Sequence, residues 1–204
     1  MKQNVSYYDP NLDVLGYYRL KQILANGFDG LQPTGSYVVS KGPEEAMRVV
    51  LDTIALFKRH VEAGNLWEEL WVGEKPKKER AAQLIYYAIA DAFCKANNLD
   101  ISPEAHMGGG PIDFKFSYGY NTRVLVEMKR SGGTVVHGYE KQLEFYKGAA
   151  QTDYAVFVIV DYGDLGNKLI EVQEIRKRRL DNGLRAADIV VINATRKASA
   201  SKRN

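Results

Sequence analysis

The sequence predicts an α/β fold in which a mixed central sheet is flanked by helices and follows a mostly helical N-terminal extension. Strand-like runs alternate with helix-like segments through the last two thirds of the chain, and the apolar run YAVFVIVDY (residues 154–162) is typical of a central strand covered on both faces. The 204 residues, 45% of them hydrophobic, suffice for one globular domain, or for one domain with an appendage.

The N-terminal region, residues 1–70, is expected to be mostly helical. One helix is predicted over residues 11–26 and a clearer one over residues 43–63, which begins with Pro-Glu-Glu and repeats apolar residues at helical spacing. Between them lies a loop rich in Gly, Ser and Pro, with one short strand at residues 37–39. No chemistry is visible here, so this region would cover the sheet, hold a partner or recognise a substrate.

The remaining elements are predicted within residues 71–197, where helical and strand periodicities alternate, and residues 198–204 are expected to be a basic tail. In chain order these elements are a long buried helix that starts after the charged residues 74–79 and ends near residue 97, hairpin strands over 112–117 and 124–130, a helix from about 137, a strand over 154–162, a helix over 165–180 and a last strand over 188–193.

Composition narrows the class of protein. The N-terminus has no apolar signal segment, and no run approaches the ~18 apolar residues of a membrane span, so a soluble, cytoplasmic protein is expected. The single cysteine, Cys94, excludes an internal disulfide, and the three histidines lack zinc-ligand spacing. A P-loop, a dinucleotide-binding glycine motif and a nucleophile elbow are all absent, which counts against a small-molecule enzyme.

Positive charge gathers toward the C-terminus, although the net charge of the chain is only +3. Residues 163–204 contain ten Lys or Arg against five Asp or Glu. A run of four cations makes this segment a candidate nucleic-acid-binding surface: Arg176, Lys177, Arg178 and Arg179. The alternative is a solvated helix face without a phosphate ligand.

Two acids and a lysine interrupt the apolar pattern of the predicted hairpin. The period of two places Leu125, Glu127 and Lys129 on one face of the second strand. Folding of the hairpin brings Asp113, on the first strand, beside Glu127. Such a group suits a hard divalent ion such as Mg²⁺, with the lysine left to steer a water or a phosphate oxygen. A cross-strand ion pair on the wet face of a sheet is the alternative.

The order of these residues resembles that of a known family. Pro111-Ile112-Asp113 is followed, fourteen residues after Asp113, by Glu127-Met128-Lys129, and then by Gln142 and Tyr146 at helical i, i+4 spacing. A hairpin, an ExK strand, a QxxxY helix and an apolar strand in this order resemble the PD-(D/E)XK nuclease superfamily, of restriction-endonuclease-like fold, and its RecB-like branch. The resemblance covers residues 76–193 and leaves the first third of the chain unexplained.

The resemblance implies a nuclease that hydrolyses phosphodiester bonds with Mg²⁺ or Mn²⁺, as an endonuclease or an exonuclease. It assigns Asp113, Glu127 and the Met128 carbonyl to the metal, with Glu79 as a further ligand from the preceding helix. Lys129 would orient or help deprotonate the attacking water and offset charge in the transition state. Gln142 and Tyr146 would position the phosphate or the lysine.

Substrate and partners are less narrowly implied. DNA is favoured over RNA because most of the superfamily acts on DNA, and a role in restriction or phage defence is compatible by association with the fold. A homodimer or a partner subunit stays open. The alternative function is a catalytically inactive module of the same fold that binds nucleic acid or a protein partner, but inactive members usually lack a motif residue, and all are present here.

Overall fold

The computed structural model describes residues 42–106, 110–119 and 121–197. The helix predicted over residues 11–26, the strand at 37–39 and the basic tail at 198–204 lie outside the described residues. The chain divides into two compact units, Met1–Val39 and Ser40–Asn204, and every element below belongs to the second unit. The boundary predicted after residue 70 falls inside that unit.

A five-stranded mixed sheet forms the centre of this unit, with strand order β3-β4-β5-β6-β7. The strands are β3 (Asp100–His106), β4 (Pro111–Tyr118), β5 (Thr122–Arg130), β6 (Ala155–Asp161) and β7 (Asp188–Asn193). Pairing is antiparallel from β3 through β5 and parallel from β5 through β7. The β5 strand therefore has an antiparallel neighbour on one side and a parallel neighbour on the other.

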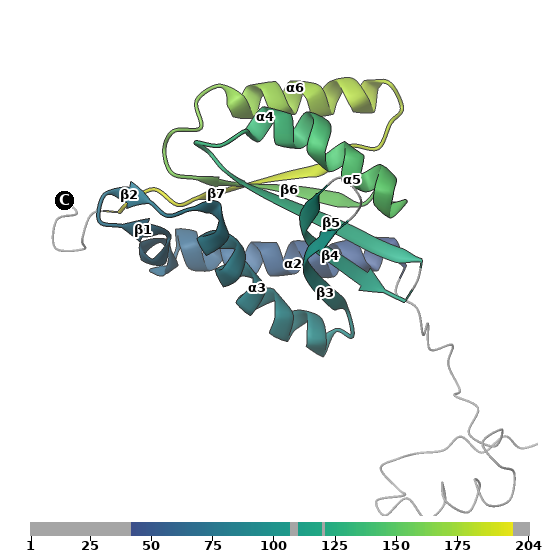
Figure 1. Cartoon of the computed structure of the whole chain (residues 1–204), viewed down its shortest axis with the longest axis horizontal. Coiled ribbons are helices and arrows are strands. Elements are labelled where there is room, and N and C mark those ends of the chain that lie inside the picture. The colour runs from purple at the N-terminus through teal and green to yellow at the C-terminus, as the bar shows by residue number, and fades with distance from the viewer. Residues whose placement is uncertain (1–41, 107–109, 120, 198–204) are drawn as a thin grey trace, which may run out of the picture. The chain divides into compact units, whose positions relative to one another are not determined.

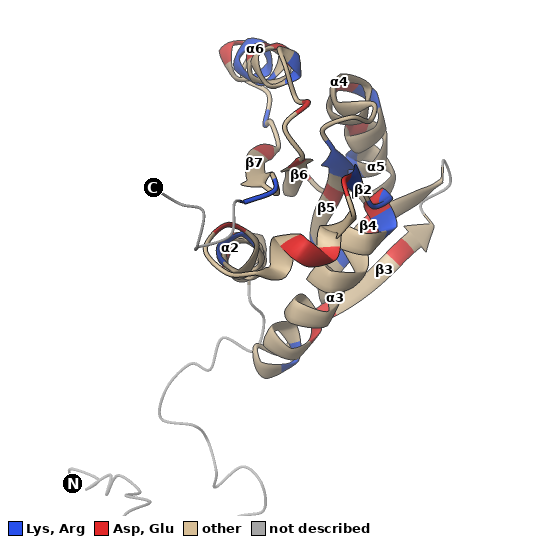
Figure 2. Ribbon diagram, turned by 90° about the vertical axis from the view of Figure 1, so that its left-hand side faces the viewer, with Lys and Arg blue, Asp and Glu red and all other residues tan. Residues whose placement is uncertain are grey.

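Helices cover both faces of the sheet, as Figures 1 and 2 show from two directions. One face carries α2 (Pro43–Glu62) and α3 (Glu79–Ala96), and the other carries α4 (Val135–His137), η3 (Gly138–Gln142), α5 (Leu143–Ala150) and α6 (Lys168–Asp181). The short η2 (Leu66–Leu70) and the two-stranded β1 (Trp71–Val72) and β2 (Lys75–Pro76) connect α2 to α3. The predicted α/β class with a mixed sheet and flanking helices is confirmed.

Two hydrophobic clusters, one on each face of the sheet, hold the layers together. The alternation of β5 sends Val126 and Met128 toward α2 and α3, and Leu125 toward the helices of the other face. Each fully buried aliphatic or aromatic side chain contributes ~1.5–3 kcal/mol through the hydrophobic effect. Because Ile54 and Phe57 of α2 lie in the first cluster, this helix is part of the same core as the sheet.

No helix in the described ranges combines the length and apolarity that a membrane crossing requires. The strands predicted at residues 112–117, 124–130, 154–162 and 188–193 are all present, as are the helices of α2, α3, α5 and α6. The edge strand β3 and the small β1–β2 hairpin were not predicted. In β3 only Ile101 is buried, and Pro103 lies within the strand, so its sequence carries neither an apolar alternation nor a high strand propensity.

Candidate functional site

Asp113 lies where β4 and β5 stop pairing, since the ladder between the two strands ends at Phe114 opposite Val126. Its carboxylate accepts a hydrogen bond from the Met128 backbone N–H (2.7 Å) through Oδ2. Oδ1 accepts a second bond from Gln83 Nε2 (2.8 Å). The Asp113 side chain thus accepts the hydrogen bond of the Met128 amide, just beyond the end of the β4–β5 ladder. It is held in place by β5 on one side and by α3 on the other.

Glu127 and Lys129 project from the same face of β5, as their spacing predicts. Lys129 Nζ lies 2.5 Å from Glu127 Oε1 and 3.5 Å from Glu79 Oε1. Glu127 is only 2% exposed, and its second oxygen, Oε2, is buried without a hydrogen-bond partner in the described part of the chain. A buried carboxylate oxygen without a donor is costly, so this oxygen marks a place where a ligand would be stabilising.

The first two turns of α3 reach the ends of both acid-bearing strands. Glu79 Oε2 accepts a hydrogen bond from the backbone N–H of Arg130 (3.0 Å), and Gln83, one turn later, holds Asp113. The polar i, i+4 pair of Glu79 and Gln83 faces the site because the intervening apolar residues of α3 pack on the sheet. Glu79 is thus held at the Arg130 backbone, next to Lys129, and the contact of Gln83 with Asp113 was missed in the sequence.

Gln142 and Tyr146 approach the site from the face of the sheet opposite to α3, which is the face from which Glu127 and Lys129 project. Gln142 is the last residue of η3, a π-helical segment, and its Oε1 is buried without a hydrogen-bond partner among the described residues. The Tyr146 hydroxyl lies at the start of β4, since a Cβ on Gly110 would be 3.3 Å from it. π-helical turns are rare in proteins overall, but those that do occur often lie at functional sites.

Close approach of the π-helical segment to Lys129 depends on a glycine. A Cβ added to Gly138 would lie 3.1 Å from Lys129 Cε and 3.4 Å from a ring carbon of Phe157. The lysine stem therefore passes directly beneath the helix backbone. This packing confines the ammonium to the side of the carboxylates.

Burial and mutual repulsion make the carboxylates hard to ionise. Burial, together with the charge of Glu127, raises the pKa of Asp113 to about 7, even though Lys129 and the Met128 N–H oppose the shift. Burial also raises the pKa of Glu127 in spite of its ion pair with Lys129. Burial alone would lower the pKa of Lys129, but the surrounding carboxylates, led by Glu127, raise it. The site has an excess of negative charge that a cation would relieve.

The carboxylate oxygens of this site suit a hard divalent cation that takes only one or two of its ligands from the protein and the rest from water. The described residues contain no group of three or more His, Cys, Asp or Glu side chains that could hold a metal ion. Mg²⁺, however, commonly takes only one or two carboxylates and completes its shell with water. Asp113 and the unpartnered Oε2 of Glu127 meet that requirement.

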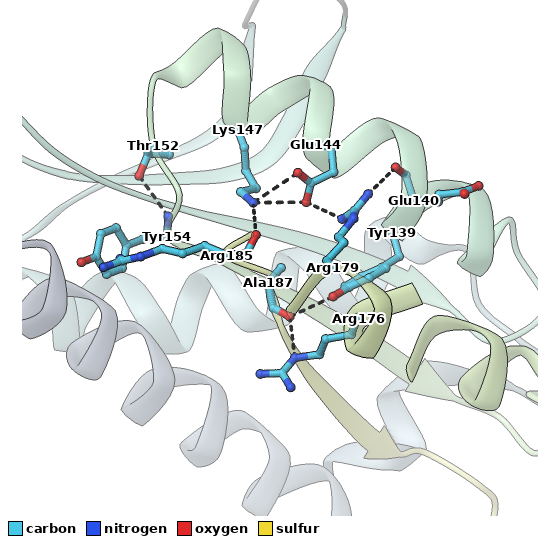
Figure 3. A network of polar contacts seen from close by, with 10 residues as sticks. All are labelled: Tyr139, Glu140, Glu144, Lys147, Thr152, Tyr154, Arg176, Arg179, Arg185 and Ala187. Atoms are coloured by element: carbon cyan, nitrogen blue, oxygen red, sulfur yellow. Dashed lines mark hydrogen bonds and ion pairs between the residues drawn. The ribbon is translucent and has the colours of Figure 1, made fainter. Parts of the chain in front are cut away.

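The predicted basic run on α6 separates into two kinds of residue. Arg176 pairs with Asp188 (2.9 Å), and Arg179 pairs with Glu144 (2.5 Å) and stands 5.5 Å above the Tyr139 ring (Figure 3). Arg176 thus links α6 to β7, and Arg179 links α6 to α5. Lys177 and Arg178 are exposed and are the members of the run that remain on the surface.

A hollow of about 420 Å³ opens beside the carboxylates. Its lining comes from the start of α3, the end of β5, the loop that follows and the π-helical segment: Lys78, Glu79, Lys129, Arg130, Gly133, Thr134 and Gln142. Arg130 was missed in the sequence, although it directly follows the ExK motif.

A protein-family model matches more than half of the chain. This model, of the family described as a domain of unknown function (DUF8371), matches residues 46–164. The matched segment contains both acid-bearing strands, Glu79, Gln142 and Tyr146, and ends before α6. No curated protein and no solved structure matches the sequence. The chain therefore belongs to the family described as a domain of unknown function (DUF8371).

Proposed function

We propose that this protein is a metal-dependent nuclease with a restriction-endonuclease-like PD-(D/E)XK fold, which hydrolyses phosphodiester bonds of nucleic acid. The observation that carries the proposal is the buried, unpartnered Glu127 Oε2 beside Asp113. An ordinary structural ion pair satisfies the oxygens that it buries, whereas Glu127 Oε2 has no hydrogen-bond partner among the described residues. A perturbed carboxylate pair of this kind is typical of functional sites.

Asp113, Glu127 and the Met128 carbonyl would hold Mg²⁺ or Mn²⁺, with Glu79 as a further ligand. A bound divalent ion lowers the pKa of a water molecule and neutralises charge on a phosphate. Lys129, paired with Glu127 and Glu79, would hold the attacking water and offset the negative charge that builds on the phosphate. Gln142 and Tyr146 would fix the position of the phosphate or of the lysine stem.

DNA is the proposed substrate, in preference to RNA, because most members of the superfamily that the motif order resembles act on DNA. A role in restriction or phage defence follows from the same association. One observation favours a second candidate, a binding module without catalysis. Lys129 Nζ is already engaged by two carboxylates, 2.5 Å and 3.5 Å away, and a site closed in this way would bind a strand without cutting it.

The test is a cleavage assay on the full chain with supercoiled plasmid, linear duplex, single-stranded DNA and RNA, each in Mg²⁺, Mn²⁺ or EDTA. We expect cleavage of at least one DNA substrate in a divalent metal and none in EDTA. The control pair is Glu127→Gln against Glu144→Gln, since both remove a glutamate charge that is paired with a buried lysine and only the first lies in the proposed site. A wild type that binds nucleic acid but never cuts it would favour the module.

A further inference from the structure

The hollow beside the carboxylates has the opposite charge from the site that it adjoins. Its charged lining comprises three cations and one carboxylate: Lys78, Lys129, Arg130 and Glu79. Lys129 also pairs with Glu127 deeper in, where it is outnumbered by the carboxylates of Asp113 and Glu127, so the cations that belong to the rim alone are Lys78 and Arg130. A negative interior and a positive rim thus lie side by side.

Lys129 pairs with Glu127 and Glu79, whereas the other two cations of the rim, Lys78 and Arg130, pair with no acid of the described chain. The Glu79 carboxylate is engaged by the Arg130 backbone N–H and by Lys129. The Lys78 side chain is exposed and makes no hydrogen bond or ion pair within the described ranges. The Arg130 guanidinium donates one bond, to the Lys77 carbonyl (3.2 Å), and pairs with no carboxylate of the described chain. Most of its five N–H donors are therefore available to a ligand.

The wall opposite α3 is a firmly anchored loop. Ser131 Oγ donates to Asp164 and accepts a bond from the Tyr162 N–H (2.9 Å), while Lys168 Nζ donates to the Ser131 carbonyl (2.6 Å). The chain turns tightly here, because Gly133 N–H donates to the Arg130 carbonyl (2.8 Å) and a Cβ on Gly133 would lie 3.1 Å from the same oxygen. This wall of the hollow is therefore held by hydrogen bonds of the fold itself.

We propose that this hollow binds a backbone phosphate of the nucleic-acid strand adjacent to the scissile phosphate, with Lys78 and Arg130 as its ligands. The inference rests on the proposed nuclease function and deepens it. A planar guanidinium matches the oxygens of a phosphate in a bidentate manner, and a lysine adds a flexible point charge. With the metal site on one side and this subsite on the other, consecutive phosphates of a strand fix its direction across the site.

The experiment measures binding of a fluorescein-labelled single-stranded oligonucleotide to the full chain in EDTA, where no cleavage intervenes. The variant is Lys78→Gln/Arg130→Gln, and the matched control is Arg48→Gln/Lys95→Gln, an equal charge change at residues that do not line the hollow. Loss of the single phosphate contact made by these two charges should flatten the slope of log affinity against log salt by ~0.7 and weaken binding about tenfold, with the control unchanged.

Lys78→Gln alone provides a second variant, because its side chain makes no hydrogen bond or ion pair within the described ranges and can be changed without loss of the fold. It should flatten the slope by a part of that ~0.7, since Arg130 still contacts the phosphate. Wild-type affinity and slope in both hollow variants would overturn the subsite, even if the wild type cuts DNA. Conversely, a wild type that loses affinity on these substitutions but never cuts in any metal would overturn the nuclease function and leave the phosphate subsite standing.

Discussion

The part of the chain that the structure describes contains two clusters in which glutamate pairs with a largely buried lysine, and the two differ in how their charges and hydrogen bonds are balanced. In the first, Glu127 and Glu79 surround Lys129. In the second, shown in Figure 3, Lys147 and Arg179 surround Glu144. The Lys147 ammonium donates to both Glu144 oxygens (3.2 Å each) and to the Arg185 carbonyl (3.1 Å). Arg179 also donates to the Glu140 carbonyl (2.8 Å), so this cluster is closed on itself.

The difference lies in the balance of charge and donors. The Glu144 cluster has two cations for one carboxylate, and each cation also bonds a backbone carbonyl. The Glu127 cluster has more carboxylates than cations, an oxygen without a donor and carboxyl groups whose pKa is raised by burial. Burial of an ion pair is tolerated where its partners are satisfied, and it points to a ligand where they are not.

The largest expected effect is on cleavage. Glu127→Gln and Asp113→Asn should each reduce the single-turnover rate by ~1,000-fold or more, because each removes a charge needed to hold the metal. Glu144→Gln should stay within a few-fold of the wild type. Comparison of the three variants under one set of metal and substrate conditions checks this. If Glu127→Gln cuts at the wild-type rate, the Glu127 cluster is not catalytic and does not differ in function from the Glu144 cluster.

The two lysines should separate rate from stability. Lys129→Ala should slow cleavage by at least ~100-fold, the scale of one preorganised electrostatic group, with little change in substrate affinity. Lys147→Ala should keep the rate and lower the free energy of unfolding by ~1–3 kcal/mol, since it strips its acceptors of a buried donor. Rate, affinity and melting temperature are measured on each preparation. Two variants with the same profile would show that the clusters do not differ in kind.

The pH dependence of stability should differ between the clusters in metal-free protein. Because the pKa of Asp113 is raised to about 7, chiefly by burial, its stabilising contribution is complete below its ordinary range and is lost as the pH rises through 7. Asp113→Asn does not titrate, so at pH 8 it should exceed the wild type in unfolding free energy by up to a few kcal/mol, at ~1.4 kcal/mol per unit of pKa.

Glu144→Gln is the comparison for that measurement and should be less stable than the wild type at pH 8, since it gives up charged partners on both sides. Urea unfolding in EDTA from pH 5 to pH 8 provides the data. If the unfolding free energies of Asp113→Asn and the wild type change in parallel with pH across this range, ionisation of the buried Asp113 does not destabilise the fold.

The smallest expected effect concerns α6. Lys177→Gln/Arg178→Gln should lower the salt slope of duplex DNA binding by ~0.9 for each phosphate that is no longer neutralised, at an unchanged melting temperature. Arg179→Gln should instead lower the melting temperature and leave the slope alone, because its guanidinium is bound to Glu144 and the Glu140 carbonyl. An unchanged slope in the double variant would return Lys177 and Arg178 to a solvated helix face.

Much of the fold could be predicted because the apolar period is strong where both faces of an element are covered. The period of two in β5 placed Glu127 and Lys129 on one face, and the predicted last strand coincides with β7 (Asp188–Asn193). The edge strand β3 escaped prediction since an edge needs little apolar surface.

Parts of the site depend on partners that are distant in sequence. Nothing near Arg179 indicates that its charge is met by Glu144, 35 residues earlier in the chain. Gln83 contacts Asp113 across 30 residues and looked like an ordinary polar helix residue. The roles of such residues become visible only in the folded structure, where their partners, Glu144 and Asp113, lie beside them.

The π-helical turn at Gly138–Gln142 makes chain length at this point critical for the side chains of the turn itself. A π-turn holds one residue more than an α-turn, so deletion of one residue would allow an uninterrupted α-helix from Val135 to Ala150. Because the extra residue is held within one turn, the segments on either side would keep nearly the same relative rotation, and the change would fall on the turn that carries Gln142. A single-codon deletion is thus the smallest genetic change that could leave this helix folded and the turn beside the carboxylates altered.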